Sequence, residues 1–206
     1  MPADAEAAER LREWLDEDTG GLDVIGLDLG GADVSGADFS DSWFTDTRLV
    51  DARLAGAEFY RADLERADLT GADATGASFL RANLDDAVLR GTVLDGANLV
   101  RASVYGVDAS HARCRGTRFM GASLQKVDLR GADLTDAVFE ENLFEVVLDH
   151  TTVVSGMTGS VYGPAQLLSE DGQRTELAGV DLEKWLRDRG ADVRVVEPGW
   201  WLGQQD

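Results

Sequence analysis

Residues 62–71 read Ala-Asp-Leu-Glu-Arg-Ala-Asp-Leu-Thr-Gly, two five-residue units with the same order of residue types. The frame runs from Leu22 to Gly156 as 27 consecutive units without insertion or deletion. The third residue, here called the centre, is apolar or Cys in 26 of the 27 units, and Asp149 is the exception. All seven phenylalanines are centres; Ala stands two residues before the centre in 16 units, and Gly two residues after it in 13. Such self-similarity indicates a repeat architecture.

A period of five fits neither the period of an α-helix (about 3.6) nor that of a long β-strand (about 2). Three extended residues place the small residue inward, the next outward and the centre inward. The remaining two residues must turn the chain, and Gly tolerates the backbone angles that tight turns need. Four units therefore close one square coil, which stacks on the next coil through backbone hydrogen bonds.

Centres four units apart should then lie on one wall of the coil. One such series holds five of the seven phenylalanines: Phe39, Phe59, Phe79, Leu99, Phe119 and Phe139. This clustering predicts aromatic rings stacked along the interior of a solenoid.

Units such as 62–66, 67–71 and 132–136 resemble the pentapeptide-repeat family, and the resemblance extends over the whole frame, 22–156. It implies an all-β solenoid, specifically a right-handed quadrilateral β-helix. With about 4.8 Å between stacked strands, 27 units predict about seven coils, in a rod about 30–35 Å long.

The chain divides into three predicted segments: an N-terminal capping helix at 1–21, the β-helix at 22–156 and a small α+β appendage at 157–206. Residues 3–18 predict an amphipathic helix with Leu11, Trp14 and Leu15 on one stripe. This helix either covers the open apolar end of the first coil or binds a partner.

The appendage predicts a hairpin, a helix and a strand. Glu170-Asp171-Gly172 indicates a hairpin tip between strands near 160–168 and 173–178. Residues 181–189 indicate a helix capped by Asp181 and ended by Gly190. A strand at 193–196, ended by Pro198, follows.

In the last four units the predicted outward residue is apolar: Val138, Leu143, Leu148 and Val153. Exposing such a row to water is costly, so another surface should cover it. Either the tail folds back with Leu182, Trp185 and Leu186 of its helix, or a second copy packs there. The resemblance supports the second alternative, because family members that act on topoisomerases dimerise through their C-terminal ends.

Catalysis finds little support in the residues. His111 and His150 have no Cys, His or carboxylate partner at a metal-ligand spacing. Cys114 is a centre, which predicts a buried, inert thiol. The glycines sit at turn spacing rather than ahead of a helix, so no phosphate-binding motif is present. We expect no enzymatic activity, cofactor or metal.

One edge of the phenylalanine wall differs from the rest of the surface. Successive coils place Tyr60, Leu80, Val100 and Met120 after the centre, followed in the first three by Arg61, Arg81 and Arg101. We call these seven residues the strip. Apolar groups beside arginines, in a chain of charge −20, predict a contact site for a protein partner or a second copy. Because arginines about 5 Å apart repel, an acidic partner, or Glu58 and Glu65 of the same chain, should offset them.

The balance of 19 basic and 39 acidic residues argues against direct binding of nucleic acid or of an anionic membrane. One Cys, no long apolar run and no signal-peptide layout predict a cytoplasmic protein. We expect a non-catalytic scaffold that binds a protein partner.

The resemblance implies an alternative function. Family members that inhibit or protect DNA gyrase are similar to a DNA duplex in size and negative charge, so this chain would be a DNA mimic conferring resistance to a topoisomerase poison. The repeat carries a net charge of −11 over residues 22–156 (12 basic, 23 acidic). Its outward residues alternate in sign along one wall, from Asp33 and Arg53 to Arg113 and Asp133, without a continuous acidic stripe.

Overall fold

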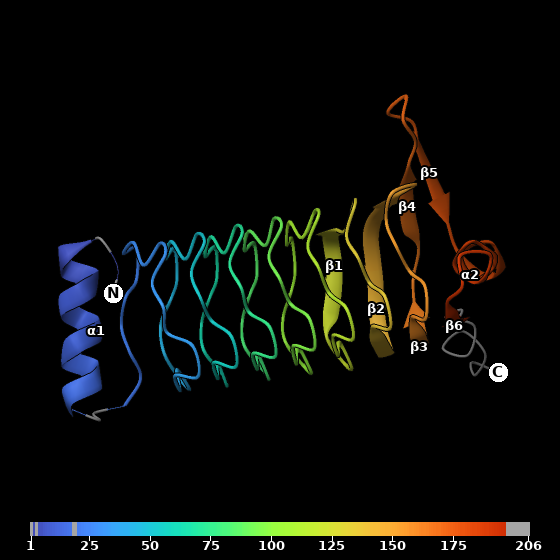
Figure 1. The fold of residues 1–206 in the computed structure, drawn as a ribbon. Helices are drawn as coiled ribbons and strands as arrows, with labels where there is room; N and C mark the ends of the chain where they lie inside the picture. The colour runs from blue at the N-terminus through green and yellow to red at the C-terminus, as the bar shows by residue number, and fades with distance from the viewer. Residues whose placement is uncertain (1, 3, 18–19, 197–206) are drawn as a thin grey trace, which may run out of the picture.

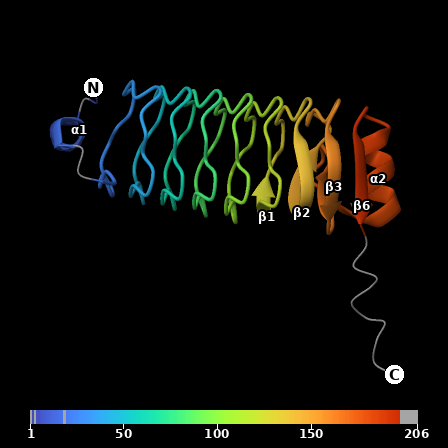
Figure 2. The ribbon, with the colours of Figure 1, turned by 90° about the horizontal axis from the view of Figure 1, so that it is seen from below.

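The computed structural model describes residues 2, 4–17 and 20–196, which form a rod of stacked coils (Figure 1). Helix α1 (Ala5–Glu17) lies at one end and helix α2 (Gly179–Arg187) at the other. In Figure 2, α1 is seen end-on, so its axis is perpendicular to the rod. The strands are β1 (Ser123–Asp128), β2 (Val138–Asp149), β3 (Thr158–Tyr162), β4 (Ala165–Leu168), β5 (Arg174–Leu177) and β6 (Asp192–Val196).

The five-residue units fold as their period predicts. The centre and the residue two before it are buried in nearly every unit, and the residue between them faces outward. Each outward residue forms a parallel bridge with its counterpart four units later, as Asp33 does with Arg53. The backbone N–H of each centre donates to a carbonyl of the next coil, as from Phe59 to Ser78 at 2.6 Å. Coils of four units, one unit to each wall, follow from this register.

The predicted stacking of phenylalanines is confirmed. Ring centroids of Phe39 and Phe59 are 5.3 Å apart, those of Phe59 and Phe79 5.0 Å, and those of Phe119 and Phe139 4.7 Å. These separations equal the rise of one coil, since each ring stacks on the equivalent ring of the next coil.

The fifth residue of the unit has a positive φ in 25 of the 27 units, and in 13 of these it is Gly. The other twelve are not Gly; examples are Arg61 at 57° and Asp86 at 58°. This conformation costs an ordinary L-residue about 1–2 kcal/mol. The backbone N–H of the corner residue donates to a carbonyl of the next coil, as from Arg61 to Leu80 at 3.1 Å, and this hydrogen bond helps to hold the corner. Val146 and Thr151 are the two exceptions.

Those exceptions mark a register slip that the uninterrupted frame conceals. β2 runs straight through residues 145 and 146, where the other units turn, so Val146 and Leu148 face inward. The pairing with β1 shifts at the same place: Gln125 lies opposite Glu145, but Val127 lies opposite Val146. The prediction that Leu148 points outward is wrong, because its side chain is completely buried.

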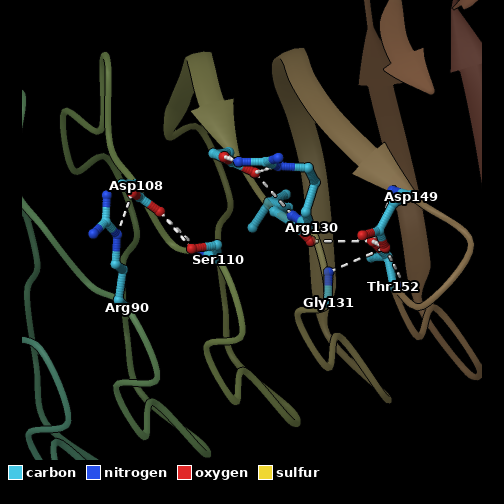
Figure 3. Close-up of polar contacts among 9 residues, drawn as sticks. Arg90, Asp108, Ser110, Arg130, Gly131, Asp149 and Thr152 are labelled. Atoms are coloured by element: carbon cyan, nitrogen blue, oxygen red, sulfur yellow. Dashed lines mark hydrogen bonds and ion pairs between the residues drawn. The ribbon is translucent and has the colours of Figure 1, made fainter. Parts of the chain in front are cut away.

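Two unfavourable features of the regular frame explain the slip. It would give the β-branched Val146 a positive φ and would bury the carboxylate of Asp149 as a centre. In the shifted register Asp149 is half-buried and Oδ1 accepts hydrogen bonds from the backbone N–H groups of Thr151 (2.9 Å), Thr152 (3.0 Å) and Gly131 (3.2 Å). Figure 3 shows Asp149 beside Gly131 and Thr152. The frame resumes by Val153, which pairs with Asp133.

Stacking continues beyond the last recognisable unit. β3 and β4 both pair in parallel with β2, and β6 pairs in parallel with β3, giving a sheet of order β5-β4-β2-β3-β6. β4 and β5 form an antiparallel hairpin that projects from the rod. The single short strand expected near 160–168 is therefore two strands, separated at Gly163-Pro164.

Helix α2 begins at Gly179, with Ala178 as its N-cap. The prediction that Asp181 caps this helix is wrong, because Asp181 lies within the first turn. Pro198, predicted to end the last strand, lies outside the described residues.

α1 contacts the first coil through one face. Ala7 and Leu11 are buried, and the indole of Trp14 stacks on Phe39 with centroids 5.0 Å apart. The indole N–H also donates to the carbonyl of Gly20 at 2.8 Å. Leu15, predicted on the same stripe, is instead 60% exposed.

Candidate protein-interaction surface

The strip occupies one longitudinal edge of the rod, where the phenylalanine wall turns into the next wall. Its four apolar side chains follow Phe59, Phe79, Leu99 and Phe119, and each is half-buried. Arg61, Arg81 and Arg101 are exposed and hold the positive-φ corner position, at 57°, 61° and 58°. Because the buried rings beneath stack about 5 Å apart, the two rows rise by the same step.

Ion pairing separates the strip from the other faces. Seven arginines of the repeat outside the phenylalanine wall pair with acidic residues: Arg48, Arg53, Arg66, Arg90, Arg113, Arg115 and Arg130. Over the described part of the chain, Arg81, Arg101 and Arg118 have no carboxylate oxygen within 4.0 Å. All three belong to the phenylalanine wall, so the repeat arginines that lack a carboxylate partner among the described residues are gathered on one face.

The carboxylates expected to offset the strip do not pair with it. Arg61 lies 3.5 Å from Asp41, a weak pair between exposed groups. Glu65 pairs instead with Arg66, on the next corner of the coil. Arg118 directs Nη2 toward Sδ of Met120 at 3.7 Å, which places a further cation beside the apolar row.

Much of the acidic charge elsewhere serves the fold itself. The outward Asp or Asn of many units accepts a hydrogen bond from the backbone N–H two residues later, an Asx turn that supports the corner. Figure 3 shows one example, in which Asp108 contacts Ser110 on one side and Arg90 on the other. The hydroxyl and then the backbone N–H of Ser35 lower the pKa of Asp33 in the same way. These aspartates are explained by local structure, without a ligand.

The sequence of the repeat matches a known family. The family model for pentapeptide repeats matches residues 32–71, 67–104 and 102–140, in eight copies. This chain belongs to the pentapeptide-repeat family. The described coils accordingly form a right-handed β-helix.

Solved structures of other pentapeptide-repeat proteins are similar to this one. HetL, involved in heterocyst differentiation regulation in the cyanobacterium Nostoc, is 21% identical with a TM-score of 0.59; the match covers 95% of this chain and 92% of HetL. Rfr23 of the cyanobacterium Cyanothece is 22% identical, covering 71% and 97%, with a TM-score of 0.44. QnrB1, a plasmid-mediated fluoroquinolone resistance protein, is 22% identical, covering 88% and 84%, with a TM-score of 0.38. No curated protein matches.

The apolar residues predicted to form a tail-docking or dimer patch do not lie together on one surface in this pentapeptide-repeat protein. Leu182 and Leu186 are the buried residues of α2, while Leu148 is buried inside the coil. Trp185 is half-buried, with the guanidinium of Arg189 4.0 Å from its ring. Val138 and Leu143 are half-buried along β2, and Val153 is 42% exposed. A second copy over this region remains a prediction.

The slipped register also creates a groove that the repeat frame did not predict. It has a volume of about 430 Å³ and is lined by Lys126, Glu145, Val146, Val147, Pro164, Gln166 and Arg174. The signal in the sequence was Asp149, the one acidic centre. Lys126 on its rim donates a hydrogen bond to the hydroxyl of Tyr105.

The groups weighed for catalysis have local explanations. Cys114 is buried as predicted, and burial raises the pKa of its thiol to about 12, so it carries no thiolate at neutral pH. Nε2 of His150 lies 3.3 Å from Glu170, in the hairpin tip. In residues 2, 4–17 and 20–196, no three His, Cys, Asp or Glu side chains gather closely enough to hold a metal ion. Nor does that part of the chain contain a helix with the length and apolar character needed to cross a bilayer.

Proposed function

We propose that this pentapeptide-repeat protein is a non-catalytic scaffold that binds a protein partner through the strip. The observation that supports this role is the pairing pattern: in the described chain, Arg81, Arg101 and Arg118 carry no acidic partner, although the net charge is −20. Guanidinium groups form bidentate hydrogen bonds with carboxylates, and arginine is enriched where protein surfaces meet. The half-buried apolar row beside them adds area that loses water on contact.

The remaining parts of the chain support this surface. α1 acts as a cap, because Leu11 and Trp14 cover apolar groups of the first coil. β6 and α2 close the other end of the rod. With both ends occupied, the long walls are the surface that remains for a partner.

Variants of the strip test the proposal. Leu80→Asp and Arg81→Glu should abolish the capture of a cross-linked partner from cells, measured by quantitative mass spectrometry. Val50→Asp and Arg90→Glu are the controls, because both residues lie on another wall of the rod. Val50 is half-buried directly after the centre Leu49, and Arg90 directly follows the centre Leu89, two coils further along. Circular dichroism establishes that all four variants fold. An identical set of partners for the strip variants and the controls would overturn the proposal.

The charge of −20 favours a second candidate function, mimicry of DNA toward gyrase. Two observations weigh against it: arginines interrupt the acidic walls, and many of the aspartates serve Asx turns. A gyrase supercoiling assay at two salt concentrations, with and without a fluoroquinolone, separates the candidates. A scaffold leaves supercoiling unchanged; inhibition or protection that weakens with salt would favour the mimic.

A further inference from the structure

We infer that the segment bound by the strip is an amphipathic α-helix, with one apolar row and an adjacent acidic row, lying along the rod. This inference rests on the partner-binding function proposed above and specifies the chemistry and secondary structure of the partner. It is drawn from the charge, spacing and length of the strip.

The charge of the strip selects an acidic partner. Arg81, Arg101 and Arg118 lie along three successive coils without an ion pair in the described chain, and Arg61 has only the 3.5 Å contact with Asp41. Cations stacked about 5 Å apart repel one another, so carboxylates placed opposite them relieve the repulsion as well as pairing with them.

The spacing of the strip selects a helix. The rings of Phe59 and Phe79 below it are 5.0 Å apart, so three such steps from Tyr60 to Met120 cover about 15 Å. Three turns of an α-helix rise about 16 Å and remain in phase within about 1 Å. Same-face residues of an extended chain recur about every 6.7 Å, which takes a strand about 5 Å out of phase over the same three steps.

The rows also match in number. In the first three coils of the strip an apolar side chain is followed directly by an arginine, so two parallel rows run along the edge. A helix with apolar residues at intervals of three and four presents one row, and the residues beside them present a second. An acidic second row places carboxylates over the arginines.

The ends of the strip limit its length. Asp41 stands in the arginine row one coil before Arg61, and Glu140 and Glu141 follow Phe139 at the other end. All three are exposed. An acidic helix longer than about three turns would therefore meet like charge at both ends, and the same carboxylates disfavour a nucleic acid or an anionic bilayer.

Two display libraries test the inference against the full-length protein. Both randomise the same number of positions with the same codons, one on a helical hairpin and the other on a disulfide-closed β-hairpin. Binders are sorted by their loss of affinity for Leu80→Asp and for Arg81→Glu/Arg101→Glu, with Val50→Asp as the matched control. Glu is compatible with the corner position, because Glu141 already occupies it with a φ of 55°.

We expect the strip-dependent binders to come from the helical library, with acidic residues at intervals of three and four beside the apolar row. Their affinity should fall by about tenfold or more for the double charge reversal. Exchanging their acidic row for lysine should restore binding to the Arg81→Glu/Arg101→Glu variant, a readout that loss of structure would not produce.

The remaining outcomes distinguish the two proposals. Strip-dependent binders that are β-hairpins, or helices without an acidic row, would overturn the inference and leave the partner-binding function standing. If neither library yields a binder that depends on the strip, both the inference and the partner-binding function are overturned. If duplex DNA or phosphatidylserine vesicles bind in a strip-dependent manner, the partner of the strip is a polyanion and the inference of an acidic helix is wrong.

Discussion

Single residues in this rod have roles that depend on their position within the five-residue unit. The outward Asp closes an Asx turn, and the fifth residue takes a positive φ. The fifth residue of one coil also lies against the fifth residue of the next, so Oδ1 of Asp86 would be 2.2 Å from a Cβ at Gly106. Gly therefore leaves room for a neighbouring side chain at some corners, while at others it eases only the backbone conformation.

The Asx turn predicts a specific pH dependence at Asp73. The hydroxyl and backbone N–H of Thr75 lower the pKa of this carboxylate, so its ionised form stabilises the fold above about pH 4 and that contribution is lost as pH falls through the lower, folded-state pKa. Asp73→Asn keeps the turn, as Asn98 does with Val100. Its deficit in free energy of unfolding relative to wild type should therefore shrink between pH 5 and pH 2 in urea titrations.

Asp73→Ala is the comparison, because it removes both hydrogen bonds. It should cost about 0.5–1.5 kcal/mol more than Asp73→Asn at pH 7. Equal stabilities of the two variants at that pH would mean that the turn contributes nothing.

The corner contacts predict that two glycines with the same φ tolerate Ala differently. Gly76 and Gly106 have φ of 65° and 68°, but nothing lies within 4 Å of a Cβ at Gly76. Gly76→Ala should cost about 1–2 kcal/mol from backbone strain alone, and Gly106→Ala should cost measurably more in chemical denaturation. Asp86→Gly should remove the extra cost of Gly106→Ala. If Gly76→Ala and Gly106→Ala are equally stable in the protein that keeps Asp86, the contact between corner residues of neighbouring coils does not affect stability.

At the scale of elements, the sequence predicts the regular coils well and the slip poorly. The period, the inward centres and the stacked phenylalanines follow from residue types alone, because each unit repeats the same constraint. The slip follows from a comparison of two registers, in which Val146 and Asp149 are both unfavourable in the regular one. Since the chain regains its frame by Val153, no insertion or deletion reveals the change.

The slipped register predicts unequal effects at Leu148 and Val153, which the repeat frame treats as equivalent outward residues. Leu148→Ala removes a completely buried side chain and should cost about 2–5 kcal/mol, whereas Val153→Ala, at a side chain that is 42% exposed, should change stability by under about 1 kcal/mol. Urea unfolding followed by circular dichroism measures both. A small effect of Leu148→Ala would instead favour the regular frame, in which Leu148 points outward.

At the scale of the whole molecule, the position of the strip was predictable but its ion pairing was not. The ladder of Tyr60, Leu80, Val100 and Met120 follows from the register of four units per coil. Which arginines remain unpaired depends on contacts between neighbouring coils, as in Arg113 with Asp95 and Arg48 with Asp28. Those contacts depend on side-chain geometry, which residue types do not specify.

A rod of identical coils is stable only if its ends are closed, and this gives a prediction for α1. Leu11 is 2% exposed and Trp14 stacks on Phe39, so Leu11→Asp with Trp14→Ala should detach the helix and uncover the first coil. Because the uncovered end presents apolar groups and unpaired backbone, rods should then associate end to end in a concentration-dependent manner, measured by sedimentation velocity. The strip lies on the long wall, so its binding should persist in the associated rods. Arg10→Ala/Arg12→Ala, on the exposed side of the same helix, is the control. If Leu11→Asp/Trp14→Ala sediments like this control at every concentration, α1 is not a cap and is instead free to bind a partner.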